Sequence, residues 1–178
     1  MVATAKPVGD NRYRETYGRV FEDFAVGDVY EHRPGRSITE SDNTWFTLLT
    51  MNQHPLHFDR EYAKHSEFGR PLVNSALTLA IVAGMSVSDV SQQAIANLGW
   101  TDIVMPAPVF VGDTIYAESE VLEKRESKSR PTQGIVSVET RAHNQDGKLV
   151  MSYKRSVLVP KRGHTVEDRM DAAARSEG

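Results

Sequence analysis

Residues 70–87 read RPLVNSALTLAIVAGMSV, and this stretch decides the fold. A helix built from it is apolar on nearly every side, with Asn74 and Ser75 as candidate caps at its start. A helix that is apolar all round has to be buried all round. We therefore expect residues 74 to about 90 to form one helix that the rest of the chain wraps.

The second half of the chain has the composition and the period of β-strands. Its segments are rich in β-branched and aromatic residues and alternate in part between apolar and polar positions. Asp146 and Gly147 predict a type I′ hairpin turn between two of these segments, because that turn requires positive φ angles. The expected strands cover residues 94–105, 109–127, 134–145 and 148–160.

The first half supplies one strand and one further helix. Residues 21–32 run through Gly27 and Asp28 into the strand, and residues 37–51 predict a helix that Thr39 or Ser41 caps and that Pro55 ends. A strand, a helix, a buried helix and then an antiparallel meander form an α+β pattern. An antiparallel sheet wrapped around one long buried helix is the hot-dog fold, which is the architecture we expect.

Three segments divide the chain of 178 residues. Residues 19–162 are expected to be a single hot-dog domain. Residues 1–18 are polar and aperiodic, so we expect a flexible N-terminal arm. Residues 163–178 are charged and rich in alanine, so we expect a tail that either frays or forms a short surface helix.

Composition limits the classes of function. A formal charge of −3 gives no electrostatic reason to expect a nucleic-acid partner or an anionic membrane surface. The absence of cysteine excludes disulfides and thiolate zinc sites. No apolar run is long enough to span a membrane, and the start of the sequence has no secretory signal. We therefore expect a cytoplasmic protein.

The stretch TMNQHPLHFDREYA, residues 50–63, places Asn52, His54 and His57 within six residues. A buried helix or strand does not require that mixture. A capped loop with a surface histidine is the simplest alternative to a functional site. Two histidines without a third ligand of clear spacing are weak support for a metal, so we predict no metal site.

Three segments together resemble the MaoC-like hydratase/dehydratase family: PLHFD at 55–59, FGRPLV at 68–73 and PVFVGD at 108–113. The R-specific enoyl-CoA hydratases of that family carry the motif G-D-x-N-P-L-H. The resemblance covers roughly residues 20 to 160. Three longer segments are similar to the branch that hydrates mesaconyl-CoA and itaconyl-CoA: FGRPLVNSALTLAIVAGMSV at 68–87, EKRESKSRP at 123–131 and NQDGKLVMSYKR at 144–155.

The resemblance implies how the motif residues act. Addition of water to an enoyl thioester needs a base for the water and donors for the enolate oxygen. The alignment places His57 on the family histidine and Asn52 on the family aspartate. An asparagine side chain orients water but accepts no proton. His57 is therefore the expected base, with His54 and Asp42 as candidates for a second titrating group.

The resemblance also places the enolate site at the start of the buried helix. There a backbone N–H faces the thioester oxygen, supported by the positive end of the helix dipole. Ser75 is the expected backbone donor, and Asn74 and Ala76 are expected to contact the substrate. Helix capping by Ser75 is an equally good explanation of the same residue.

Basic residues are candidates for contacts with the substrate's charges. Arg70 precedes Pro71, and it either anchors the loop or contacts an acid group on the acyl chain. The run EKRESKSR, residues 123–130, is either a solvated strand end or a contact for coenzyme A phosphates. The residues concerned are Lys124, Arg125, Lys128 and Arg130.

The expected function is hydration or dehydration of a short enoyl-CoA by a homodimer or larger homo-oligomer, with the dicarboxylic mesaconyl-CoA and itaconyl-CoA as candidate substrates. No cofactor is expected, because coenzyme A is part of the substrate. A non-catalytic acyl-CoA-binding subunit of a heteromeric dehydratase is the alternative that Asn52 suggests. A hot-dog thioesterase is a third, although residues 74–88 lack the carboxylate such enzymes generally need on the buried helix.

Overall fold

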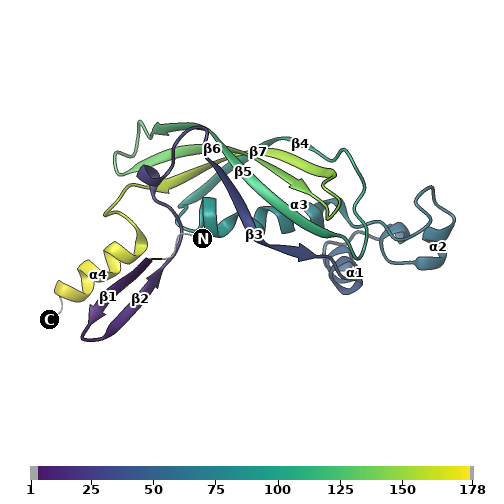
Figure 1. Cartoon of the computed structure of the whole chain (residues 1–178), viewed down its shortest axis with the longest axis horizontal. Helices are drawn as coiled ribbons and strands as arrows, with labels where there is room; N and C mark the ends of the chain where they lie inside the picture. Colours follow the sequence, from purple (N-terminus) through teal and green to yellow (C-terminus); the bar gives the residue numbers. More distant parts are fainter. Residues whose placement is uncertain (1–3, 177–178) are drawn as a thin grey trace.

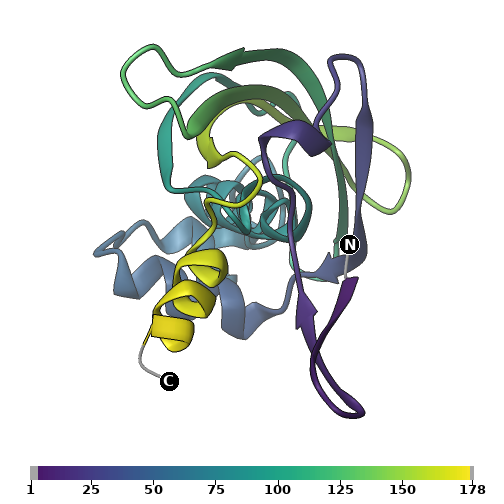
Figure 2. The same cartoon turned by 90° about the vertical axis from the view of Figure 1, so that its left-hand side faces the viewer.

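A computed structural model describes residues 4–176 of the chain. Its main body is a five-stranded antiparallel sheet in the order β3-β5-β6-β7-β4 (Figure 1). The sheet curls around helix α3, so the α+β hot-dog prediction is confirmed (Figure 2). The strands are β3 (Val29–Ser37), β4 (Ala96–Val104), β5 (Thr114–Glu126), β6 (Gln133–His143) and β7 (Leu149–Pro160).

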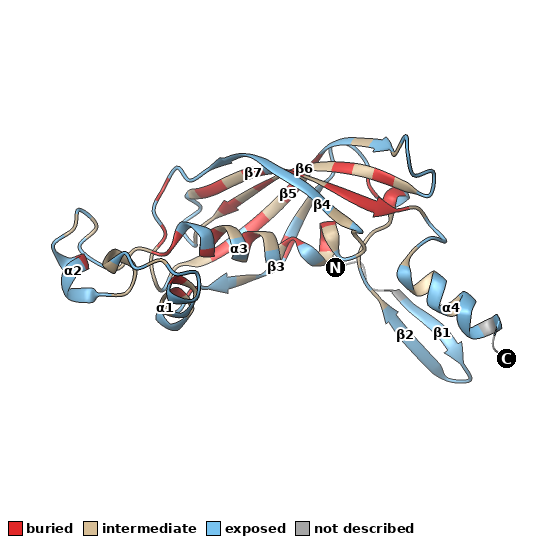
Figure 3. Ribbon diagram, turned by 180° about the vertical axis from the view of Figure 1, so that it is seen from behind, coloured by how far each residue is buried: buried red, intermediate tan, exposed pale blue. Residues whose placement is uncertain are grey.

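Alternation along the strands produces the core. β6 alternates strictly between buried and half-buried positions, so one of its faces covers α3 and the other faces outward. β7 carries the completely buried Met151 and Val157 on the covered side. The buried residues accordingly gather on the concave face of the sheet (Figure 3).

Helix α3 (Ser75–Met85) is not buried all round, so that prediction is wrong for the single chain. Leu77, Thr78 and Val82 are buried against the sheet. Ala76 and Gly84 are exposed on the opposite side. The exposed residues on this open face are small. Apolarity alone does not show whether a small residue is exposed or packs against a neighbour.

The predicted single helix over residues 74–90 is in fact two elements. The α-helical hydrogen bonding of α3 ends at Met85, and a π-helical turn follows at η3 (Val87–Ser91). The predicted helix is therefore in the right place, but it is not one regular α-helix.

Helix α1 (Glu40–Leu49) begins with a capping box formed by Thr39 and Asp42. Thr39 is thus the cap, which leaves Ser41 in the first turn. The helix ends well before Pro55, because Met51 has a left-handed φ of 59°. Pro55 instead opens a short 3-10 turn, η2 (Pro55–His57), and helix α2 (Arg60–Lys64) follows it.

The ends of the chain are more regular than expected. In place of a flexible arm, residues 4–16 form a hairpin of β1 (Thr4–Gly9) and β2 (Arg12–Thr16). The C-terminal tail forms helix α4 (Val166–Ser176), one of the two alternatives expected. Residues 1–3 and 177–178 of the predicted arm and tail lie outside the described residues.

The first strand begins at Val29, directly after Gly27 and Asp28 as expected, while residues 21–23 form the 3-10 turn η1 (Phe21–Asp23). One local prediction needs correction. The β6–β7 hairpin exists, but only Gly147 of its turn has a positive φ, so the turn is not type I′. Across residues 4–176, no helix has both the length and the apolarity needed to cross a bilayer.

Candidate active site

The segment between α1 and α2 positions the two motif histidines. Asn52 follows the left-handed Met51, and its side-chain Oδ1 accepts the N–H of His54 at 3.0 Å. His54 then caps η2, because its Nδ1 accepts the N–H of Leu56 at 3.1 Å. This polar loop is therefore an ordered turn that fixes where the half-buried His57 lies.

Hydrogen bonding gives the two histidines opposite neutral tautomers. Nδ1 of His57 lies 2.9 Å from the carbonyl oxygen of Leu72, and a carbonyl only accepts, so Nδ1 carries the proton. Nδ1 of His54 accepts a backbone N–H, so its proton sits on Nε2. Neutral His57 consequently offers a basic Nε2, whereas neutral His54 offers an N–H. The two rings are 5.8 Å apart between centroids.

The start of α3 supplies a backbone donor. Oδ1 of Asn74 accepts the N–H of Ala76 at 2.9 Å, so that N–H is already used by the cap. Among residues 4–176 the structure gives the N–H of Ser75 no acceptor, and Ser75 is exposed. The first N–H groups of a helix attract anionic oxygen. Of the predicted segment, Ser75 is thus the donor that remains available.

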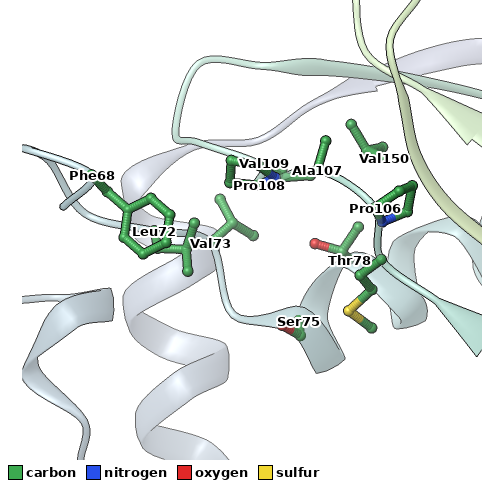
Figure 4. A pocket seen from close by; sticks show the side chains of 11 residues that line it. Phe68, Leu72, Val73, Ser75, Thr78, Pro106, Ala107, Pro108, Val109 and Val150 are labelled. Carbon is green, nitrogen blue, oxygen red and sulfur yellow. The ribbon is translucent and has the colours of Figure 1, made fainter.

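A cavity of about 270 Å³ lies beside this helix start (Figure 4). Its wall is mostly apolar, and the hydroxyl-bearing Ser75 and Thr78 both belong to it. His57 is not part of the wall, but Leu72, whose carbonyl holds the His57 ring, is. The lining residues are Phe68, Leu72, Val73, Ser75, Thr78, Met105, Pro106, Ala107, Pro108, Val109 and Val150.

Thr78 and the 105–109 segment of this wall were not predicted from the sequence. Thr78 lies three residues after Ser75, and this helical spacing was the available signal. Pro106 and Pro108 mark the end of a strand in the sequence, but nothing in the sequence shows that the irregular segment returns to α3.

Asp42 is not brought to the site. One of its carboxylate oxygens accepts from the N–H and hydroxyl of Thr39, and the other accepts from Arg36 at 2.8 Å. The backbone hydrogen bond from Thr39 is the main reason that the pKa of Asp42 is lowered. A carboxylate held charged in a capping box is a poor proton carrier, so Asp42 is a helix cap here.

Asn74 and Arg70 also differ from their expected positions. Asn74 is buried, with Nδ2 donating to Thr47 Oγ1 at 3.3 Å, so its amide supports the helix start rather than facing a ligand. The guanidinium of Arg70 stacks on Phe110 at 3.8 Å from the ring centre and does not line the cavity. Phe110 in turn contacts Phe68 of the wall edge-on.

The basic run lies elsewhere in the fold. The β5–β6 hairpin is at the opposite end of the sheet from α1 and α2 (Figure 1). Nζ of Lys124 donates to the carbonyl of Phe24 at 2.8 Å, and Arg125 pairs with Glu123 at 3.4 Å. Lys128 and Arg130 are exposed in the loop between the strands. The single chain does not bring these four cations to the helix start.

A second polar cluster was not expected from the sequence. His32 bonds Asp89 through Nδ1 at 3.0 Å and Ser119 through Nε2 at 2.8 Å. Burial lowers the pKa of His32 despite the neighbouring carboxylate. The order Ser–His–Asp is that of a hydrolase triad, but His32 and Ser119 are completely buried and Asp89 nearly so. This cluster joins the π-helical turn to the sheet and is not open to a substrate.

A model of the mesaconyl-CoA hydratase family matches residues 4–177. The chain belongs to this family. The resemblance to MaoC-like hydratases found in the three motif segments is thereby confirmed. Within residues 4–176 there is no group of three or more histidine, aspartate and glutamate side chains arranged to hold a metal ion.

The names of individual relatives agree with the mesaconyl-CoA hydratase family. The mesaconyl-CoA hydratase of Cereibacter sphaeroides is 36% identical over 145 residues, which cover 82% of this chain and 42% of that protein. The (R)-specific enoyl-CoA hydratase of Aeromonas caviae is 31% identical over 115 residues, covering 65% of this chain and 81% of that protein. The chain thus spans less than half the length of the first relative and most of the second.

A solved structure gives the same result. The crystal structure of a MaoC domain protein dehydratase from Chloroflexus aurantiacus has a TM-score of 0.77 to this chain at 36% identity. The similarity covers 82% of this chain and 41% of that one. The fold of this chain is therefore consistent with its membership of the mesaconyl-CoA hydratase family.

Proposed function

We propose that this chain adds water to a short enoyl-CoA thioester, or removes it in the reverse direction. The observation that carries the proposal is the bond between His57 Nδ1 and the Leu72 carbonyl, which leaves Nε2 of His57 basic. Leu72 is three residues before Ser75, and both residues line the same cavity. The Leu72 carbonyl thus links the base to the segment that carries the oxyanion donor and lines the apolar pocket.

Each of the site residues has a separate role in the proposed reaction. Nε2 of His57 takes a proton from water, and the water oxygen bonds to the β-carbon of the enoyl group. The electrons of the double bond move to the thioester oxygen, where the Ser75 N–H and the α3 dipole stabilise the enolate. The imidazolium of His57 then returns the proton to the α-carbon, so one water is added in all.

Asn52 has a supporting role in this proposal. Its Oδ1 is already bonded to the N–H of His54, and its amide nitrogen is a donor only. It is therefore able to hold the water oxygen but not to remove a proton. The basic nitrogen of neutral His54, Nδ1, is already occupied by the N–H of Leu56, which leaves His57 as the base.

The cavity is suited to the acyl group. Its volume of about 270 Å³ lies just below the range of roughly 300–1,000 Å³ for sites that enclose drug-sized ligands. Coenzyme A itself would therefore lie along the surface. The names of the relatives support mesaconyl-CoA as the substrate, with itaconyl-CoA as an alternative that also carries a free carboxylate.

The purified chain tests the function directly. We expect loss of enoyl absorbance with mesaconyl-CoA to be faster than with crotonyl-CoA, and itaconyl-CoA is assayed beside them. Release of free thiol is followed in parallel, and we expect none. Thiol release would indicate a thioesterase. Absence of any reaction would favour the non-catalytic subunit that Asn52 in place of the family aspartate suggests.

Substitution of the two motif residues tests the division of roles. We expect His57→Ala to lower kcat by about two to four decades, because general-base catalysis contributes that much. Asn52→Ala should lower kcat by less, since it removes an orienting group only. The two rates are measured with the substrate that reacts fastest. A His57→Ala protein as active as the parent would remove His57 from the mechanism.

Preference for a carboxylate-bearing substrate needs a cation, because a buried unpaired anion costs several kcal/mol. We propose Arg70, whose stacking on Phe110 holds it beside the Phe68 side of the cavity wall. Arg70→Met should lose about tenfold or more in selectivity for mesaconyl-CoA over crotonyl-CoA and keep the crotonyl-CoA rate. Arg60→Met is the matched control, because Arg60 lines the same surface hollow as Arg70 but pairs with Glu40. Parallel loss of both rates in Arg70→Met would assign Arg70 to the loop instead.

The site is proposed to work in a homodimer joined through β4. This strand is one of the two edges of the sheet, and it exposes Leu98, Trp100 and Ile103. Unpaired apolar edges of this kind promote association. The Cereibacter sphaeroides relative, of which the matched region covers 42%, has room for a second unit of similar size.

Light scattering tests the homodimer. We expect a mass of two chains for the parent and of one chain for Trp100→Asp, which places a charge in the apolar edge. Val26→Asp changes an exposed valine remote from β4 and should stay dimeric. A parent mass of one chain would contradict the proposal, as would dissociation of Val26→Asp.

A further inference from the structure

Asn43 of α1 is a completely buried residue that bonds to three parts of the site at once. Its Nδ2 donates to the carbonyl of His57 at 2.7 Å and to the carbonyl of Leu72 at 3.1 Å. Its Oδ1 accepts the N–H of Asn74 at 2.9 Å. These bonds use both donors of the amide and its acceptor.

The partners of Asn43 are the groups whose relative position the reaction requires. His57 supplies the base, and Asn74 caps the helix whose next N–H belongs to Ser75. The carbonyl of Leu72 accepts from Asn43 and from the ring of His57 together. The amide of Asn43 therefore orients the very carbonyl that keeps the proton of His57 on Nδ1.

We propose that Asn43 is a positioning residue that fixes the His57 tautomer and holds it in register with the start of α3. The kinetic part of this inference rests on the proposed hydratase function. Asn43 acts through Leu72, His57 and Asn74 and does not itself touch the substrate. Loss of its amide leaves the Leu72 carbonyl free to turn away from the imidazole, after which no bond selects one neutral tautomer.

Thr47 provides a matched control for a purely structural role. It lies one helical turn after Asn43, is also completely buried, and its Oγ1 accepts from Asn74 Nδ2. Its side chain bonds neither His57 nor Leu72 in the described structure. Thr47→Val thus removes a buried hydrogen bond to the same cap without touching the base.

The test begins with ¹⁵N NMR of histidine-labelled protein without substrate. We expect His57 of the parent, and of Thr47→Val, to be in the Nδ1–H form when neutral. Asn43→Ala should give a mixture of the two tautomers. Asn43→Asp is the second variant, because it keeps nearly the same shape and an acceptor for the N–H of Asn74 but cannot donate to both carbonyls. Circular dichroism verifies that each variant is folded before its tautomer is compared with that of the parent.

Kinetics supply the second readout. We expect the Asn43 variants to lose about tenfold to a hundredfold in kcat, since small displacements of a catalytic group have effects of that size. KM should stay within about threefold, because Asn43 does not contact the substrate. Thr47→Val should keep a larger share of kcat than either Asn43 variant.

Each result decides the inference. A parent His57 in the Nε2–H form would overturn it, and so would an Asn43 variant that keeps both the parent tautomer and the parent kcat. Equal effects of Thr47→Val and Asn43→Asp on the tautomer would reduce Asn43 to a structural residue. If the parent hydrates no thioester, the proposed function fails, yet the tautomer measurement still decides what Asn43 does.

Discussion

The structure depends on the packing of α3 into the concave face of the sheet. Leu77, Thr78 and Val82 are buried there, and full burial of a side chain such as valine contributes about 1.5–3 kcal/mol. This packing fixes the axis of the helix and therefore the point where its first turn emerges. The Ser75 N–H lies at that point, beside the cavity. The same contacts that stabilise the fold thus aim the helix dipole.

The proposed chemistry depends on hydrogen bonds among segments that are distant in sequence. The two histidines of one short loop have opposite neutral tautomers. The ring of His57 donates to a carbonyl, whereas the ring of His54 accepts a backbone N–H. Asn43 connects the carbonyl to both the base and the helix start. In this account the departure from the family aspartate at Asn52 is tolerated because the base is held by other bonds.

Much of the fold was predictable from the sequence, because period and turn chemistry act locally. Apolarity predicted α3, and β-branched alternation predicted four of the sheet strands. The exposed face of α3 was not predictable, since alanine and glycine read as apolar whether they are covered or open. The hairpin of residues 4–16 was missed because both its strands are polar and lack the alternation of a half-buried strand.

The site was predictable only in part. The motif pointed to His57 and Ser75 as candidates, but the partner that sets the His57 tautomer is 15 residues away in sequence. Asp42 and Arg70 were chosen for their charge, whereas a capping box and an aromatic ring determine where they lie. Spacing reveals which residues are near each other in a loop or helix. Spacing does not reveal to which carbonyl a buried amide donates its hydrogen bond.

A crystal structure with the hydrated product of mesaconyl-CoA would show whether His57 and Ser75 hold the reacting groups. We expect the new hydroxyl within hydrogen-bonding distance of Nε2 of His57. The thioester oxygen should accept from the N–H of Ser75, with the acyl group in the cavity beside Thr78. A thioester bound away from the start of α3, with Nε2 of His57 facing only solvent, would contradict the account.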